Sequence, residues 1–342
     1  MRARIVFLCL LISLSASAHN VTEYEDYYEV RHSWICEGRN CSITLNISTE
    51  LYDYYRNDRE HLAYSYQFNE SEMQPNYYSF MLSEHDRPLM RAVADEFSRY
   101  VLTEKDQIEL ALSFVQSLPY AFDADSKDED EYVRYPVETL VDGCGDCEDK
   151  VALLVALLYE MDMDFVLLIL PEHMAVGVHC DEIEAQRYLL FEGRRYYYLE
   201  TTMPNWQIGQ IPEEYFNAEM EAVPVDDLPN LFVKGVHFES QSALVFEKAD
   251  CTLQLNLHDL GPGKVTGLEL WVWLVENGKR QRVLAEEYFA LPDLQEGERR
   301  TETLALKSVI KENCTIVMEL SGNEIEVQSF EIALDYRRSR RF

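Results

Sequence analysis

Residues 143–158 read Gly-Cys-Gly-Asp-Cys-Glu-Asp-Lys-Val-Ala-Leu-Leu-Val-Ala-Leu-Leu and set the fold of the surrounding region. Asp146, followed three residues later by Asp149, is typical of a helix N-terminus, and the apolar run behind it predicts a buried helix over 146–158. Cys147 then lies in the first turn, where unpaired backbone N–H groups and the helix dipole favour a thiolate. We therefore interpret Cys147 as a candidate nucleophile.

Short β-branched and aromatic runs follow this helix and predict an antiparallel meander. They cover residues 165–170, 173–180, 188–192 and 195–202. His173 stands at the entrance of the second run, and Glu200 lies in the last. A carboxylate in an apolar strand is unfavourable unless it is paired, and a catalytic imidazole needs an acceptor that holds its tautomer. The order predicts a nucleophile at Cys147, its base at His173 and an orienting acid at Glu200.

The acidic segment 146–149 opposes activation of the cysteine. Negative charge beside the Cys147 thiol raises its pKa, so the imidazole must supply most of the activation. Of eight histidines, only His173 and His179 lie in the apolar runs after the helix. We expect His173 to be the base and His179, at the far end of its strand, to be a structural or surface residue.

Three sequence blocks resemble the motif blocks of the transglutaminase-like superfamily, whose core is papain-like. The blocks Gly-Asp-Cys, His-Met-Ala-Val and Tyr-Leu-Glu-Thr-Thr occupy 145–147, 173–176 and 198–202, in the family's order and approximate spacing. The chain is also similar to secreted transglutaminase-like proteins of methanogenic archaea, closely so over 114–212. Two positions depart from the family pattern: the superfamily more often has Asp where Glu200 stands, and an aromatic residue where Ala175 stands.

The resemblance implies a cysteine enzyme that acts on amide bonds of a protein or peptide substrate. Cys147 would attack a carbonyl, His173 would move the proton, Glu200 would orient the imidazole, and the Cys147 backbone N–H would be the first oxyanion donor. Hydrolysis and acyl transfer to an amine share this chemistry, and we expect hydrolysis because water is the default acceptor. A non-enzymatic binding module with an unused triad is the alternative.

The first 18 residues are typical of a signal peptide. Two arginines precede the apolar run 5–14, and a small-residue cleavage site, Ala-Ser-Ala, occupies 16–18. The apolar run is too short to span a bilayer, and no later segment is long and apolar enough either. The sequence therefore predicts an extracellular or cell-surface protein without a transmembrane segment, with glycosylation and association with the cell envelope as further expectations.

The chain is strongly acidic, with a formal net charge of -32 over 342 residues. Such a surface repels phosphate backbones and anionic lipids, so nucleic acid is excluded as an expected partner. The acidic segment 123–131 begins like a calcium loop, Asp-x-Asp, but lacks the turn glycine. We expect a solvated loop there, with a bound cation as the alternative.

The cysteine count suggests one free thiol. Of eight cysteines, Cys9 lies in the predicted signal peptide, and an odd number remains. The expected pairs, which spacing alone does not fix, are Cys36–Cys41, Cys251–Cys314 and Cys144–Cys180. This pairing leaves Cys147 as the lone thiol.

Two other interpretations of the Cys144-x-x-Cys147 pair remain open. The two cysteines could form a disulfide with each other, or they could bind zinc together with His179 and Cys180. Cysteines of exported proteins more often oxidise than hold a metal. We therefore expect no metal and no cofactor in the site.

The fold class predicted from these elements is α+β in several parts. An N-terminal extension over 19–103 contains a strand at 42–48 and a helix at 88–101. The papain-like transglutaminase core over 104–226 begins with a helix at 105–118. An acidic segment with two prolines, 224–229, is the expected boundary to a C-terminal Ig-like β-sandwich over 236–336.

Overall fold

The computed structural model describes ten ranges of the chain: residues 6–7, 17–57, 81–101, 103–127, 132–185, 187–242, 249–276, 282–307, 314–323 and 325–334. The described residues up to Asp226 form one compact unit, and those from Asp227 onward form a second. Within these ranges, no helix has the length and apolar character needed to cross a membrane. The signal peptide falls mainly on residues outside the described ranges and, like the predicted domain bounds, stays a prediction.

The first unit opens with an antiparallel sheet in the order β1-β4-β3-β2, followed by the helix α1. These elements are β1 (Val6–Phe7), β2 (Ala18–Glu23), β3 (Tyr27–Cys36), β4 (Arg39–Ser48) and α1 (Thr49–Asn57). Alternate residues of β4, from Cys41 to Ile47, are buried because one face of the sheet packs on the core. The strand predicted at 42–48 is confirmed and extends further toward the N-terminus.

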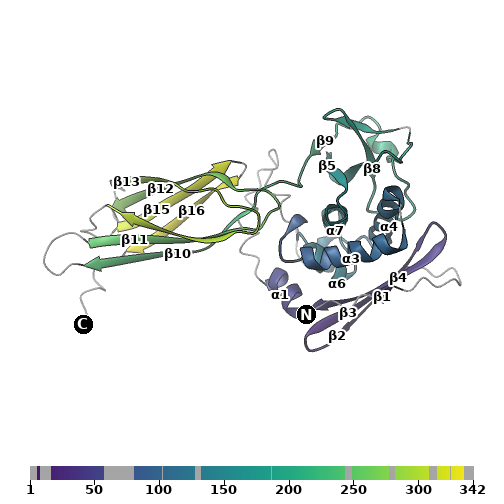
Figure 1. Ribbon diagram of the computed structural model, residues 1–342, viewed down its shortest axis with the longest axis horizontal. Coiled ribbons are helices and arrows are strands. Elements are labelled where there is room, and N and C mark those ends of the chain that lie inside the picture. Colours follow the sequence, from purple (N-terminus) through teal and green to yellow (C-terminus); the bar gives the residue numbers. More distant parts are fainter. Residues whose placement is uncertain are drawn as a thin grey trace. The chain divides into compact units, whose positions relative to one another are not determined.

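Helices form the centre of the first unit. They are α3 (Arg87–Tyr100), α4 (Glu104–Ser117), α5 (Asp123–Ser126), α6 (Pro136–Asp142) and α7 (Cys147–Glu160). The helices predicted at 88–101, 105–118 and 146–158 are confirmed within two residues at either end. Each residue of the run 151–158 in α7 is at most 3% exposed. The burial is this complete because α7 contacts helices α3, α4 and α6 as well as strands β5 and β6 (Figure 1).

A second antiparallel sheet follows α7 in the order β7-β8-β6-β5-β9. Its strands are β5 (Asp164–Leu170), β6 (His173–His179), β7 (Leu189–Phe191), β8 (Arg194–Leu199) and β9 (Glu221–Val223). The predicted strands are present, but the simple meander order is wrong, since β8 and not β7 lies beside β6. The buried residues 196–199 of β8 take the inner position, whereas the short β7 has no buried residue and forms the edge.

The described residues of the second unit form two antiparallel sheets, β10-β11-β14 and β13-β12-β15-β16. The strands are β10 (Leu231–Ser242), β11 (Ala249–Asp259), β12 (Thr266–Glu276), β13 (Val283–Ala290), β14 (Arg299–Leu306), β15 (Cys314–Asn323) and β16 (Ile325–Leu334). Apolar residues of both sheets, among them Leu255, Leu270 and Ile316, form one buried cluster. The chain as a whole is therefore a mixed α+β protein with several antiparallel sheets.

Candidate active site

Cys147 is the first residue of α7, as the sequence predicts. The Asp146 carboxylate accepts a hydrogen bond from the Asp149 N–H at 3.2 Å, and the Asp149 carboxylate accepts one from the Asp146 N–H at 3.3 Å. This capping box fixes the start of the helix. Gly145 is required by a close approach, because a Cβ there would lie 2.6 Å from the Asp149 Cβ. The segment before the helix thus places the thiol reproducibly.

The surroundings of the Cys147 thiol favour its protonated form. Burial raises the pKa of the thiol well above its ordinary value, and the charge of Glu148 raises it further. Cys147 Sγ lies 2.8 Å from Glu148 Oε2 and donates its proton to that carboxylate. The Met174 backbone N–H, at the start of β6, opposes the shift by hydrogen-bonding the sulfur. The helix N-terminus alone therefore does not produce a thiolate here.

His173 and Glu200 form the pair that the sequence predicts. His173 Nε2 and Glu200 Oε2 lie 3.2 Å apart, and the side chains are 10% and 3% exposed. The His173 ring stacks on Tyr215, with 5.1 Å between ring centroids and an interplanar angle of 4°. Because Nε2 faces the carboxylate, Nδ1 is the ring nitrogen left to act as a base.

The Glu200 carboxylate is fixed by several donors besides the imidazole. Tyr198 Oη donates to Oε2 at 2.8 Å, and the Thr202 N–H and hydroxyl donate to Oε1 at 2.9 and 2.6 Å. Burial would raise the pKa of Glu200, but the hydrogen bonds from His173 and Thr202 outweigh it and lower the pKa to about 2. Glu200 is therefore ionised at neutral pH.

Two buried side chains of the helices hold the loop that follows Glu200. Gln116 Nε2 donates to the Glu200 carbonyl at 2.8 Å and to the Trp206 carbonyl at 3.0 Å. Lys150 Nζ donates to the carbonyls of Leu118 at 2.8 Å and Thr202 at 3.3 Å. Burial lowers the pKa of Lys150 to about 8. The acid of the candidate triad is thus tied to α4 and α7.

Three carboxyl groups, two of them flanking Cys147 in the sequence, gather around the buried Arg134. Asp123, Asp146 and Asp149 each offer a ligand atom within 4.8 Å of the others, which is the only such group among the described residues. Arg134 Nη1 donates to Asp149 at 2.5 Å and to Asp123 at 2.8 Å. Burial and neighbouring carboxylates raise the pKa of Asp146 to about 9. Asp123 is buried and paired with Arg134, so the expectation of a solvated loop is wrong for this residue. Residues 128–131 of the same acidic segment lie outside the described ranges.

The cysteine pairings predicted for the site are not formed. Cys144, Cys147 and Cys180 are all free cysteines, so the Cys144–Cys180 pair and the alternative Cys144–Cys147 pair are both absent. The four proposed zinc ligands are not brought together in the described structure. His179 instead hydrogen-bonds the Arg195 carbonyl at 3.0 Å, in the structural role expected for it.

The other two predicted disulfides are not formed either. Cys36 is a free cysteine, so the Cys36–Cys41 disulfide is not formed. A hydrogen bond from Cys41 across the hairpin lowers the pKa of the Cys36 thiol. Cys314 also forms no disulfide, so the predicted Cys251–Cys314 pair is not formed either. The side chain of Cys251 itself lies outside the described part of the structure.

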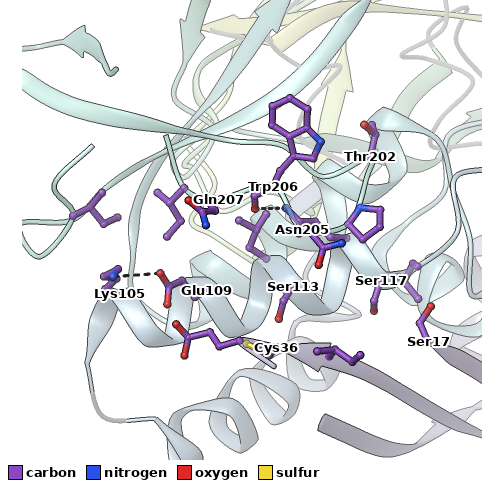
Figure 2. A pocket seen from close by; sticks show the side chains of 18 of the residues that line it. Ser17, Cys36, Lys105, Glu109, Ser113, Ser117, Thr202, Asn205, Trp206 and Gln207 are labelled. Atoms are coloured by element: carbon purple, nitrogen blue, oxygen red, sulfur yellow. Dashed lines mark hydrogen bonds and ion pairs between the residues drawn. The ribbon is translucent and has the colours of Figure 1, made fainter. Parts of the chain in front are cut away.

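A pocket of about 1010 Å³ lies beside the candidate triad, between α4 and the loop 202–208 (Figure 2). Cys147, His173 and Glu200 do not line it, but Thr202 and Gln116, which contact Glu200, do. Figure 2 shows the Ser113 and Ser117 side chains along one helix, with the Trp206 indole on the opposite side. The pocket therefore reaches the residues that support Glu200 and not the reacting atoms themselves.

Several residues of the site escaped the sequence analysis. Tyr215 lies in η2 (Glu213–Tyr215), a short 3₁₀ turn that periodicity does not reveal. Gln116 and Lys150 are buried polar residues next to apolar stretches of α4 and α7, and a polar residue in such a stretch is a signal that could have found them. Tyr198 is buried in β8, and its hydroxyl donates to Glu200.

Comparisons with known proteins add little to this geometry. No protein-family model matches the chain, and no curated protein matches its sequence. A solved structure named "Crystal structure of a TGase" is similar over 63% of this chain, at 10% sequence identity and a TM-score of 0.24. The chain covers 54%, about half, of that structure's length.

Proposed function

We propose that this protein is a secreted transglutaminase-like cysteine hydrolase that cleaves peptide or amide bonds through Cys147, His173 and Glu200. The proposed architecture is a papain-like core, in which the cysteine helix α7 packs on the strands β5 and β6, followed by an Ig-like β-sandwich. Two observations support this proposal. The three sequence blocks resemble the motif blocks of the transglutaminase-like superfamily, and the helix and strands that carry them follow one another in the order that the resemblance implies.

One observation carries the proposal: a buried imidazole–carboxylate pair stands at the start of β6, next to the strand residue that contacts the Cys147 sulfur. His173 is paired with Glu200 at 3.2 Å. The next residue, Met174, hydrogen-bonds the sulfur through its N–H. A buried carboxylate that accepts from a histidine has the role of the orienting acid in nucleophilic catalysis.

The proposed reaction begins with transfer of the Cys147 thiol proton to His173 Nδ1, while Nε2–H stays hydrogen-bonded to Glu200. The thiolate attacks the carbonyl carbon, and the oxyanion is stabilised by the Cys147 N–H, which has no intrahelical acceptor at the first position of α7. His173 then protonates the leaving amine, and a thioester remains. Water, deprotonated by His173, attacks the thioester and releases the acid and the free thiol.

A second candidate is a non-enzymatic binding module with an unused triad. The contact that favours it is the hydrogen bond from Cys147 to Glu148, because a thiol that donates to a neighbouring carboxylate is not available to the histidine. In this alternative the second unit and the acidic surface would bind a partner at the cell envelope, and alkylation of Cys147 would leave that binding unchanged.

The test is a Cys147-dependent reaction of the full chain with a mixture of unmodified peptides, analysed by mass spectrometry. We expect cleaved or deamidated products in the wild type and none in Cys147→Ser. A labelled primary amine added to the same reaction separates the two chemistries: incorporation faster than hydrolysis would replace hydrolase by acyltransferase. Products that persist in Cys147→Ser, or no product and no acyl adduct on Cys147, would contradict an enzymatic role.

A further inference from the structure

Two histidines of the first sheet that do not belong to the candidate triad face each other. His19 on β2 and His32 on β3 are directly opposite in the strand register. Their Nδ1 atoms lie 3.3 Å apart, and their ring centroids lie 5.4 Å apart. His32 is 2% exposed and packs against Trp34 and Phe114, whereas His19 is half-buried.

The partners of the outer ring nitrogens fix where the protons are. His19 Nε2 lies 3.4 Å from the Val141 carbonyl, which can only accept, so Nε2 carries the proton. His32 Nε2 lies 2.6 Å from Ser117 Oγ. The single hydroxyl proton of Ser117 is donated to the Phe114 carbonyl at 2.5 Å, so Ser117 accepts and His32 Nε2 must also donate.

The inner nitrogens therefore present two lone pairs to each other. Neutral imidazole carries one N–H, and in both rings it is on Nε2. Two acceptors at 3.3 Å repel unless a proton or a metal cation is shared between them.

We propose that His19 and His32 hold one divalent transition-metal ion of the imidazole-binding kind, such as Zn²⁺, through their two Nδ1 atoms. Two nitrogens at bonds of about 2.0–2.1 Å in a tetrahedral arrangement are roughly 3.3–3.4 Å apart, which matches the observed separation. The Nε2–H groups held by a backbone carbonyl and a serine hydroxyl are the outer contacts that ligating histidines have in metalloproteins.

The location gives such an ion a structural role near the nucleophile. It would link the β2–β3 hairpin to the end of α4, where Ser117 sits at the edge of the pocket in Figure 2. The His19 ring also packs against Gly143, where an added Cβ would lie 2.2 Å from His19 Cδ2. Gly143 begins the segment that leads into Cys147. The predicted signal cleavage after Ala18 retains His19, and the proposal does not depend on the proposed activity.

The test is Zn²⁺ titration of the full chain, labelled with ¹⁵N-histidine, at pH 7.5 with excess Mg²⁺. Mg²⁺ occupies carboxylate sites and competes poorly for imidazole. We expect one equivalent of Zn²⁺ to shift the Nδ1 resonances of two histidines. Calorimetry should show the affinity falling more than about tenfold in His19→Gln, since even outer contacts of a metal ligand contribute that much. The control His179→Gln should bind as the wild type does.

Three results would overturn the proposal. Nδ1 resonances unmoved at one equivalent of Zn²⁺ would exclude the site, and this measurement needs only the wild type, so it holds even if His19→Gln fails to fold. Undiminished affinity in a folded His19→Gln would place the ion elsewhere, on thiols or carboxylates. A proton shared between the two rings and insensitive to Zn²⁺ would replace the metal by an imidazole–imidazolium pair.

Discussion

The two halves of the candidate triad have opposite surroundings. Glu200 accepts hydrogen bonds from His173, from Tyr198 and twice from Thr202, and its pKa is lowered to about 2. Cys147 has a carboxylate as its hydrogen-bond acceptor, and its pKa is raised well above the ordinary value. The base and its acid are thus preorganised, whereas the nucleophile is held in its protonated form.

This difference indicates where control of the site lies. A preorganised base supports catalysis only if the thiol proton can reach it. In the present geometry Glu148, and not His173, accepts that proton. Substrate binding that displaces the Glu148 side chain would release the thiol to the histidine, so we interpret Glu148 as the residue that keeps the site at rest.

The largest effect is expected when the buried carboxylates near the nucleophile lose their counter-charge. Arg134→Met leaves the carboxylates of Asp123 and Asp149 buried without a counter-charge, and breaking a buried pair in this way costs about 3–5 kcal/mol. Urea unfolding, followed by fluorescence that includes Trp34 of the same unit, measures the loss. The control Arg31→Met removes a surface ion pair with Glu29 and should change stability by less than about 0.5 kcal/mol. A similar small change in Arg134→Met would mean that the cluster is largely uncharged.

The next largest effect concerns Glu200, the acid paired with His173, whose contribution to the stability of the fold depends on pH. Because the folded-state pKa of Glu200 is depressed from 4.5 to about 2, its ionisation stabilises the fold above pH 4.5, and this stabilisation is lost as the pH falls toward 2. The shift corresponds to about 3 kcal/mol, lost at about 1.4 kcal/mol per pH unit below pH 4.5. The stability gap between wild type and Glu200→Gln should therefore shrink between pH 6 and pH 3.5. A gap that stays constant would show that Glu200 is not preorganised as an ion.

A smaller change should convert the resting thiol into a reactive one. Glu148→Gln removes the charge next to Cys147 and the acceptor of its proton, so the thiol pKa should fall by at least about one unit, which is tenfold in reactivity at neutral pH. Iodoacetamide labelling mapped by mass spectrometry measures the rate at Cys147. Glu192→Gln, an exposed turn residue, is the matched control and should leave the rate unchanged. An unchanged rate in Glu148→Gln would remove Glu148 from the account.

The smallest effect is expected at the neighbouring cysteine. Cys144 is a free cysteine, and burial raises the pKa of its thiol. Cys144→Ser should therefore leave both the labelling rate of Cys147 and the urea midpoint within error of the wild type. Peptide mapping of the unreduced wild type should likewise find no Cys144–Cys147 bond. A disulfide at this position would overturn the interpretation of Cys147 as a free nucleophile.

Local signals made much of the site predictable from sequence. The acidic cap and the apolar run specify where α7 begins, because capping and burial both act within a few residues. His173 at a strand entrance and Glu200 beside apolar residues follow from the same local reasoning. The structure pairs these two residues as the sequence suggests.

The unpredicted parts depend on long-range packing. In the sheet, β8 lies next to β6 and β7 lies at the edge, because β8 is the more buried strand. The alternation of apolar and polar residues in the sequence does not show which of two strands is the more buried. Tyr215 stacks on His173 from a turn 42 positions further along the chain. Cys144 and Cys180 were paired by counting residues, and counting carries no geometry.

The most direct test of the account compares two variants in one experiment: the pH dependence of Cys147 alkylation in Glu148→Gln and in Glu148→Gln with His173→Gln. The single variant should alkylate with a lower pH midpoint than the wild type, because the thiol proton can now pass to His173, whose imidazolium stabilises the thiolate. The double variant should lose the part of this gain that His173 supplies and have a higher midpoint than the single variant. Equal profiles in the two variants would contradict the central claim that His173 acts on Cys147.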